Sequence, residues 1–185
     1  MNFNVWTLPN AISSYRLFAG PACLYFLTAD LHNGLWFALA IMIMAEISDF
    51  LDGFLARQFH MVSRVGKVLD PMADSLYRVS VFIGFAAMGW MPVWMLLIIL
   101  SRDIIVSYLR IIAEQRLTTL SARQSGKIKA VVQSAAQMTV VVMFAIWGPD
   151  HAGLHEVAFG VLLLATLMTA YSLVDYAMSV VFKLD

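Results

Sequence analysis

Long apolar segments alternate with short polar connections along the whole chain. The apolar segments run over about 9–29, 35–58, 65–88, 92–115, 124–147 and 154–181. A helix that crosses the hydrocarbon core of a bilayer needs about 20 mostly apolar residues, and each segment is long enough. The pattern therefore predicts an all-α integral membrane protein with six transmembrane helices.

The composition agrees with this prediction. Of the 185 residues, 61% are hydrophobic and only 13% are charged, whereas soluble domains have about 25% charged residues. We find no low-complexity tract and no sequence repeat, so we expect a single domain over 1–185. The short segment Met1–Thr7 contains Phe3, Val5 and Trp6, and we expect it to lie in the membrane interface as an N-terminal lead-in.

Basic residues gather in the connections on one side of the predicted bundle. They are Arg57, Arg64 and Lys67 after the second span, and Arg116, Arg123, Lys127 and Lys129 after the fourth. The connections on the other side, near 30–33, 91–92 and 149–156, contain no lysine or arginine. By the positive-inside rule, the basic connections and both termini face the cytoplasm. The formal net charge of zero gives no general attraction to nucleic acid, and we expect no such partner.

Four aspartates stand out in this apolar background: Asp49, Asp52, Asp70 and Asp74. The first two are three residues apart and the last two are four apart, so each pair lies on one face of its helix. Carboxylates that converge between helices repel one another unless cations lie among them. Because oxygen-only ligands suit Mg²⁺ or Mn²⁺, the pattern predicts a divalent-metal site.

Intramembrane carboxylates can instead form a proton or cation relay in a small transporter. Two neighbouring residues argue for a different ligand. Gly53 lets a ligand approach the backbone closely, and Arg57 offers a forked donor that suits a diphosphate. The cluster also lies at a helix end rather than midway along a span. These features favour a site for a metal-bound nucleotide diphosphate.

This stretch resembles the signature of the CDP-alcohol phosphotransferases, D-x2-D-G-x2-A-R-x8-G-x3-D-x3-D. Every defined position is filled, by Asp49, Asp52, Gly53, Ala56, Arg57, Gly66, Asp70 and Asp74. Three further segments are similar to the phosphatidylglycerophosphate synthases of this family: Pro9 to Arg16, with Ser13 for the usual Thr; Ser101 to Arg110, with Asp103 for the usual Glu; and Gly126 to Gln133, with Ala130 for the usual Thr.

The resemblance implies an enzyme that transfers the diacylglyceryl phosphate group of CDP-diacylglycerol to glycerol 3-phosphate and releases CMP. It implies two Mg²⁺ or Mn²⁺ ions held by the four aspartates, with Asp74 also acting as the catalytic base. It implies a nucleotide site lined by Asp52, Gly53, Ala56, Arg57 and Gly66. It also implies a homodimer in the bacterial inner membrane, surrounded by membrane lipids.

The acceptor alcohol is inferred from basic residues outside the signature: Arg102, Arg110, Lys127 and Lys129. They suggest an anionic acceptor such as glycerol 3-phosphate, while inositol phosphate or another alcohol stays open. Lysines and arginines at helix ends also anchor helices to phospholipid headgroups, which is the alternative for all but Arg102. Two other function classes stay open as well, an intramembrane prenyltransferase and a non-enzymatic transporter or assembly factor.

Two charged residues depart from the family pattern. Arg78 lies one turn after Asp74, which is followed by Ser75 where the family usually has Lys, and Glu46 lies one turn before Asp49. Glu46 and Arg78 should both lie about one helical turn deeper in the membrane than the aspartates. Because an unpaired intramembrane charge is costly, we expect them to form an ion pair. The alternative is that Arg78 contacts the acceptor substrate.

Overall fold

The computed structural model describes residues 8–58, 66–115 and 124–184, and this part of the chain is entirely helical apart from short turns. The helices are α1 (Leu8–Thr28), α2 (Gly34–Gln58), α3 (Gly66–Ala87), α4 (Val93–Gln115), α5 (Gln124–Trp147) and α6 (Leu154–Leu184). Each lies within three residues of its predicted boundaries, so the predicted all-α architecture is confirmed. The expected interfacial segment Met1–Thr7 lies outside the described residues.

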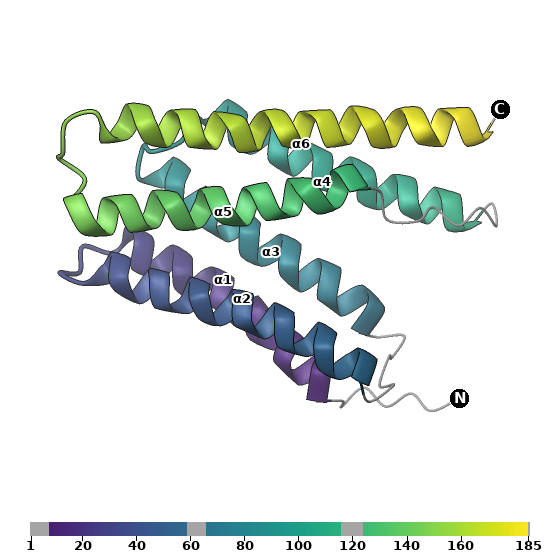
Figure 1. Ribbon diagram of the computed structural model, residues 1–185, viewed down its shortest axis with the longest axis horizontal. Coiled ribbons are helices and arrows are strands. Elements are labelled where there is room, and N and C mark those ends of the chain that lie inside the picture. The colour runs from purple at the N-terminus through teal and green to yellow at the C-terminus, as the bar shows by residue number, and fades with distance from the viewer. Residues whose placement is uncertain (1–7, 59–65, 116–123, 185) are drawn as a thin grey trace.

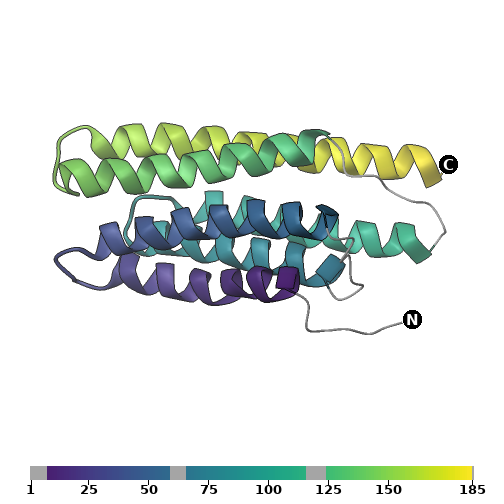
Figure 2. The same cartoon turned by 60° about the horizontal axis from the view of Figure 1, so that its bottom comes forward.

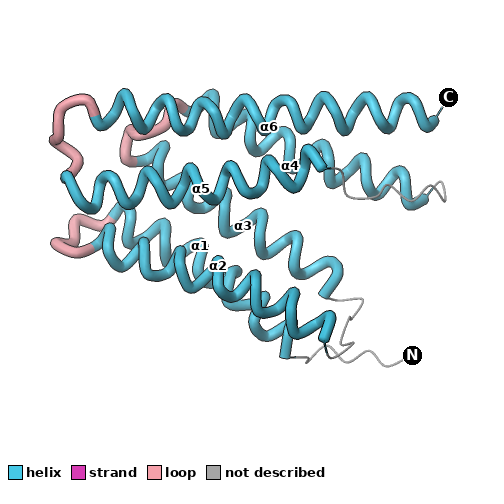
Figure 3. Tube along the Cα trace, in the orientation of Figure 1, coloured by secondary structure: helices cyan, strands magenta, loops and turns pink. Residues whose placement is uncertain are grey.

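The helices run side by side along the long axis of the molecule, and consecutive helices run in opposite directions (Figure 1). The three described turns lie together at one end, and α1 begins and α6 ends at the other (Figure 3). α1 packs against α2 and α3, whereas α6 packs against α4 and α5. Contacts of α5 with α2 and α3 join the two groups, with α5 and α6 lying to one side of the other four helices (Figure 2).

The apolar helices and the apolar outer surface identify the protein as a membrane protein. Three helical stretches in the described part are long and apolar enough to cross a bilayer: Gly34–Leu51, Gln124–Trp147 and Leu154–Ser179. Large apolar side chains cover the outside, including Phe18 at 75% exposure and Val93 at 70%. An outward-facing apolar surface of this kind suits a hydrocarbon environment, where backbone groups are satisfied within helices.

The interior changes character along the bundle. Near the turns it is apolar, and Trp90 stacks on Phe144 with ring centroids 3.9 Å apart. There α3 ends in a Schellman motif: Gly89 has φ 73°, its N–H donates to Ala86, and the Trp90 N–H donates to Phe85. Toward the end where α1, α3 and α5 begin, the buried side chains become polar. They include Arg16, Arg102, Ser125, Lys129, Gln133, Gln137, Thr169 and Ser172. This polar half of the interior is where the predicted site residues lie.

A close approach of α1 to α3 supports that polar half. A Cβ added at Gly20 would lie 2.9 Å from Ser80 Oγ and 3.1 Å from the Tyr77 Cα. The helix backbones therefore meet so closely at Gly20 that a Cβ would force its neighbours to shift. Small residues commonly let membrane helices approach this closely.

We predict that Gly20→Ala destabilises the protein by about 1–3 kcal/mol, because the overpacking outweighs the helix propensity gained. Gly160→Ala is the matched control, since a Cβ there would meet nothing within 4 Å and should be neutral or slightly stabilising. Thermal unfolding in detergent would compare them. Equal melting temperatures for the two variants would contradict a tight α1–α3 contact.

Candidate functional site

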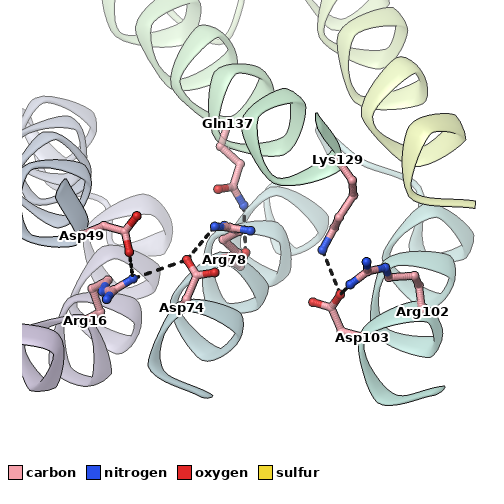
Figure 4. Close-up of polar contacts among 8 residues, drawn as sticks. All are labelled: Arg16, Asp49, Asp74, Arg78, Arg102, Asp103, Lys129 and Gln137. Carbon is pink, nitrogen blue, oxygen red and sulfur yellow. Dashed lines mark hydrogen bonds and ion pairs between the residues drawn. The ribbon is translucent and has the colours of Figure 1, made fainter. Parts of the chain in front are cut away.

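A buried arginine of α1 joins two of the four predicted aspartates. The side chain of Arg16 is 2% exposed, and its Nη1 atom donates to Oδ1 of Asp49 on α2. The same nitrogen lies 3.7 Å from Oδ1 of Asp74 on α3. Figure 4 shows the guanidinium of Arg16 beside both carboxylates. Residues far apart in the chain thus meet at one cationic nitrogen.

The other two aspartates of the motif are described to different degrees. Asp70 lies one turn before Asp74 on α3, and its buried Oδ1 atom has no hydrogen-bond partner among the described residues. Asp52 lies on α2, but its side chain is outside the described set. Among the side chains that the structure does describe, no group of three or more His, Cys, Asp or Glu lies close enough to hold a metal ion. The four-aspartate metal site therefore stays a prediction.

The predicted nucleotide-binding residues lie at the same end of the bundle. Gly53, Ala56 and Arg57 are in the last turns of α2, and Gly66 begins α3. The structure describes the helical backbone at these positions but not the side chains. The topology thus brings both halves of the signature to one end of the bundle, while the role of each residue remains a prediction.

The predicted ion pair between Glu46 and Arg78 is wrong. Arg78 Nη2 instead lies 2.7 Å from Asp74 Oδ1, on the same helix. Residues four apart on a helix are neighbours, so this pair forms without any contact between helices. The sequence argument matched Glu46 and Arg78 by depth and overlooked the nearer acid. Gln137 of α5 donates to the backbone carbonyl of Arg78 at 2.8 Å.

Glu46 and Arg78 nevertheless face a common space, which we call the α2–α5 groove. It has a volume of ≈ 360 Å³. Its lining consists of Glu46 and Asp49 from α2, Arg78 from α3, and Ala130, Val131, Ser134, Ala135 and Met138 from α5. The groove thus begins at an aspartate of the metal motif and continues past the two charged residues that depart from the family pattern.

A second polar cluster joins the other three helices. Asp103 Oδ1 on α4 lies 2.8 Å from Lys129 Nζ on α5 and 3.0 Å from Nη1 of its neighbour Arg102. Arg102 Nη2 also donates to Ser172 Oγ on α6 at 3.0 Å. Figure 4 shows this cluster beside the Arg16 cluster but separate from it. A single carboxylate therefore satisfies two buried cations from different helices.

This geometry divides the four predicted acceptor-binding residues. Arg102 and Lys129 are buried and already paired with Asp103. Lys127 is exposed at the start of α5, and the side chain of Arg110 lies outside the described set. Their role in acceptor binding is not tested by these contacts.

Two residues of the site were not singled out by the sequence argument. Arg16 and Asp103 were quoted only as members of flanking motifs, yet each joins separate elements. The signal was available, because a charged residue within an apolar span calls for a partner of opposite charge. The identity of that partner was not readable from spacing, since the contacts span 33 residues for Arg16–Asp49 and 26 for Lys129–Asp103.

Comparisons with known proteins support the same family as the signature does. A family model described as CDP-alcohol phosphatidyltransferase matches residues 6–181. A protein of Cereibacter sphaeroides named CDP-diacylglycerol–glycerol-3-phosphate 3-phosphatidyltransferase is 32% identical over 150 residues, which cover 79% of this chain and 66% of that protein. A protein of the same name from Mycoplasma pneumoniae is 31% identical, with 75% of this chain and 69% of that protein covered.

Another relative carries a different name. A Streptomyces coelicolor protein named cardiolipin synthase (CMP-forming) is 36% identical over 103 residues, which cover 54% of this chain and 47% of that protein. The chain thus matches about two thirds of the length of the first two relatives and about half of this one.

We predict that Asp103→Asn destabilises the protein by about 3–5 kcal/mol, because Lys129 and Arg102 then stay buried without their counter-charge. Adding Lys129→Met should recover much of that loss, since coupled neighbours are not additive. Asp150→Asn, in an exposed turn, is the matched control and should have no effect. Thermal unfolding in detergent compares the wild type, the single variants Asp103→Asn, Lys129→Met and Asp150→Asn, and the double variant. Additive losses in the double variant would contradict the pairing.

Proposed function

The chain belongs to the CDP-alcohol phosphatidyltransferase family, and on this premise we propose that it transfers the diacylglyceryl phosphate group of CDP-diacylglycerol to glycerol 3-phosphate and releases CMP. The observation that carries the proposal is the complete eight-position signature, two of whose aspartates meet at Arg16 in the polar half of the bundle. The names of the Cereibacter and Mycoplasma relatives support this choice of substrates.

The family is generally metal-dependent, and the donor set fits a divalent cation. One cationic nitrogen already contacts both Asp49 and Asp74, and the buried Asp70 oxygen has no partner among the described residues. Carboxylate oxygens are the ligands that Mg²⁺ and Mn²⁺ prefer. We propose that Asp49, Asp52, Asp70 and Asp74 hold two such ions, which would neutralise the diphosphate and stabilise the departing CMP.

The residues of the chain have separate roles in this reaction. Asp74 takes the proton of the acceptor hydroxyl as that oxygen bonds to the lipid-bearing phosphorus and the bond to CMP breaks. Arg78 and Arg16 lie beside the Asp74 carboxylate and orient it. No covalent intermediate is required, and the single cysteine, Cys23, is fully buried in α1.

The nucleotide and membrane settings follow from the same proposal. Gly53, Ala56, Arg57 and Gly66 line the cytidine diphosphate site, where Arg57 donates to phosphate oxygens. All six helices cross the bacterial inner membrane as one domain, with the aspartates facing the cytoplasm where the basic connections lie. The functional unit is a homodimer.

The acceptor has a second candidate. The relative named cardiolipin synthase (CMP-forming) is as similar over its matched region as the others. Phosphatidylglycerol is the alcohol that would yield cardiolipin and CMP from CDP-diacylglycerol, so it is the alternative to glycerol 3-phosphate. Of the predicted acceptor set, Lys127 is exposed, whereas Lys129 and Arg102 are paired with Asp103. We propose that Lys127 and Arg110 contact the acceptor.

An acceptor panel tests the proposed reaction. Purified protein with CDP-diacylglycerol and Mg²⁺ should release CMP fastest with glycerol 3-phosphate, compared with phosphatidylglycerol, inositol phosphate, free inositol and serine. Omission of the divalent cation should stop the release. If CMP is released with none of the acceptors, the phosphotransferase proposal fails and a transporter function is favoured instead. Release of diphosphate from a prenyl diphosphate would instead indicate a prenyltransferase.

Substitution of one aspartate tests the metal site. Asp70→Asn should abolish turnover and weaken Mn²⁺ binding, measured by calorimetry, because a ligand oxygen is lost. The metal-free variant should melt no lower than the wild type, since one of several like charges is removed. Asp49→Asn should likewise abolish turnover and weaken Mn²⁺ binding, but it should also lower the melting temperature because buried Arg16 loses its ion partner. Asp30→Asn, exposed at the opposite end, is the control. Full activity in the Asp70 or Asp49 variant would contradict the two-ion site.

A further inference from the structure

The α2–α5 groove carries charged groups with unused hydrogen-bonding capacity. Glu46 is half-buried and has no hydrogen bond or ion pair with any other described residue. Arg78 also lines the groove, and its Nη2 pairs with Asp74. An ionised carboxylate only accepts hydrogen bonds, and a guanidinium only donates them. The groove therefore offers both an acceptor and a donor to a polar guest.

The position of the groove relates it to the reaction. Glu46 lies one turn, about 4.5 Å along the helix axis, before Asp49. Arg78 contacts Asp74, which is the proposed base. A molecule bound between Glu46 and Arg78 would thus have one end beside the carboxylates that act on the acceptor hydroxyl. The facing wall on α5 has small side chains, Ala130, Ser134 and Ala135, which leave room for such a molecule.

We infer that the α2–α5 groove binds the acceptor alcohol and that Glu46 accepts a hydrogen bond from a hydroxyl that does not react. The inference rests on the proposed function and identifies the class of acceptor that the groove recognises. The fitting class is a glycerol that carries a phosphate at one end: its terminal hydroxyl reacts beside Asp74, its middle hydroxyl donates to Glu46, and Arg78 donates to its oxygens. Free glycerol 3-phosphate and the headgroup of phosphatidylglycerol both provide this group.

The test removes the middle hydroxyl from the substrate and the carboxylate from the protein. CMP release is measured with glycerol 3-phosphate and with 3-hydroxypropyl phosphate, which lacks that hydroxyl. A second arm compares phosphatidylglycerol with phosphatidyl-1,3-propanediol, so that the two sources are separated. In the arm that reacts, the wild type should prefer the glycerol compound by about ten- to a hundredfold in kcat/KM, as expected for a hydrogen bond to a charged group.

Variants at Glu46 should change this preference. Glu46→Ala should reduce it to within about twofold, and Glu46→Gln should retain part of it because the amide oxygen still accepts a hydrogen bond. The KM for CDP-diacylglycerol should stay unchanged. Glu156→Gln, at the far end of the bundle in the first turn of α6, should keep the full preference. An unchanged preference in Glu46→Ala would overturn the inference.

A groove-filling variant tests the site independently of Glu46. Ala135→Leu places a larger side chain in the groove and should raise the acceptor KM at least fivefold without changing the KM for CDP-diacylglycerol. Equal rises in both constants would overturn the assignment. If the wild type releases no CMP with any acceptor, the proposed function itself fails and the inference falls with it. CMP release with an unaltered preference in the Glu46 variants overturns the inference alone.

Discussion

The repulsion among aspartates inside an apolar bundle is the constraint on which the rest of this structure depends. Asp49 and Asp74 come from different helices and would separate if nothing positive lay between them. Arg16 supplies that charge from a third helix and is almost completely buried in doing so. The close α1–α3 contact at Gly20, one turn from Arg16, is what brings this arginine to the aspartates. The helix packing at Gly20 and the charge compensation by Arg16 therefore depend on each other.

The same constraint explains how polarity is distributed through the bundle. Near the turns, aromatic and aliphatic side chains fill the interior. Toward the other end, two groups of charges contain both signs: Arg16 and Arg78 with Asp49 and Asp74, and Asp103 with Lys129 and Arg102. A buried charge is tolerable when its partner and further hydrogen bonds compensate its lost hydration. The helices α1, α3 and α4 contribute most of these charges, and none of the three is among the most apolar candidate spans in the described chain.

Arg78 pairs with an acid on its own helix rather than with the expected partner, Glu46, on α2. Its pairing with Asp74 needs no approach of two helices, because residues four apart already lie on one helix face. This leaves Glu46 without a protein partner in the described structure and leaves the α2–α5 groove with both charges along it. The residues that depart from the family pattern therefore lie beside the proposed reaction centre. That placement is typical of positions that determine which substrate an enzyme accepts.

The sequence by itself determined the number, approximate length and helical nature of the six helices, because apolar runs of this length have few alternatives to a helix. It also determined the motif, since i,i+3 and i,i+4 spacings place aspartates on one face whatever the helices pack against. Only the tertiary structure decided the partners: Arg16 with Asp49 and Asp74, Lys129 with Asp103, and Arg78 with Asp74 rather than Glu46. The physical reason is that ion pairing depends on a few ångströms of separation, which helix rotation and packing set and which spacing along the chain does not encode.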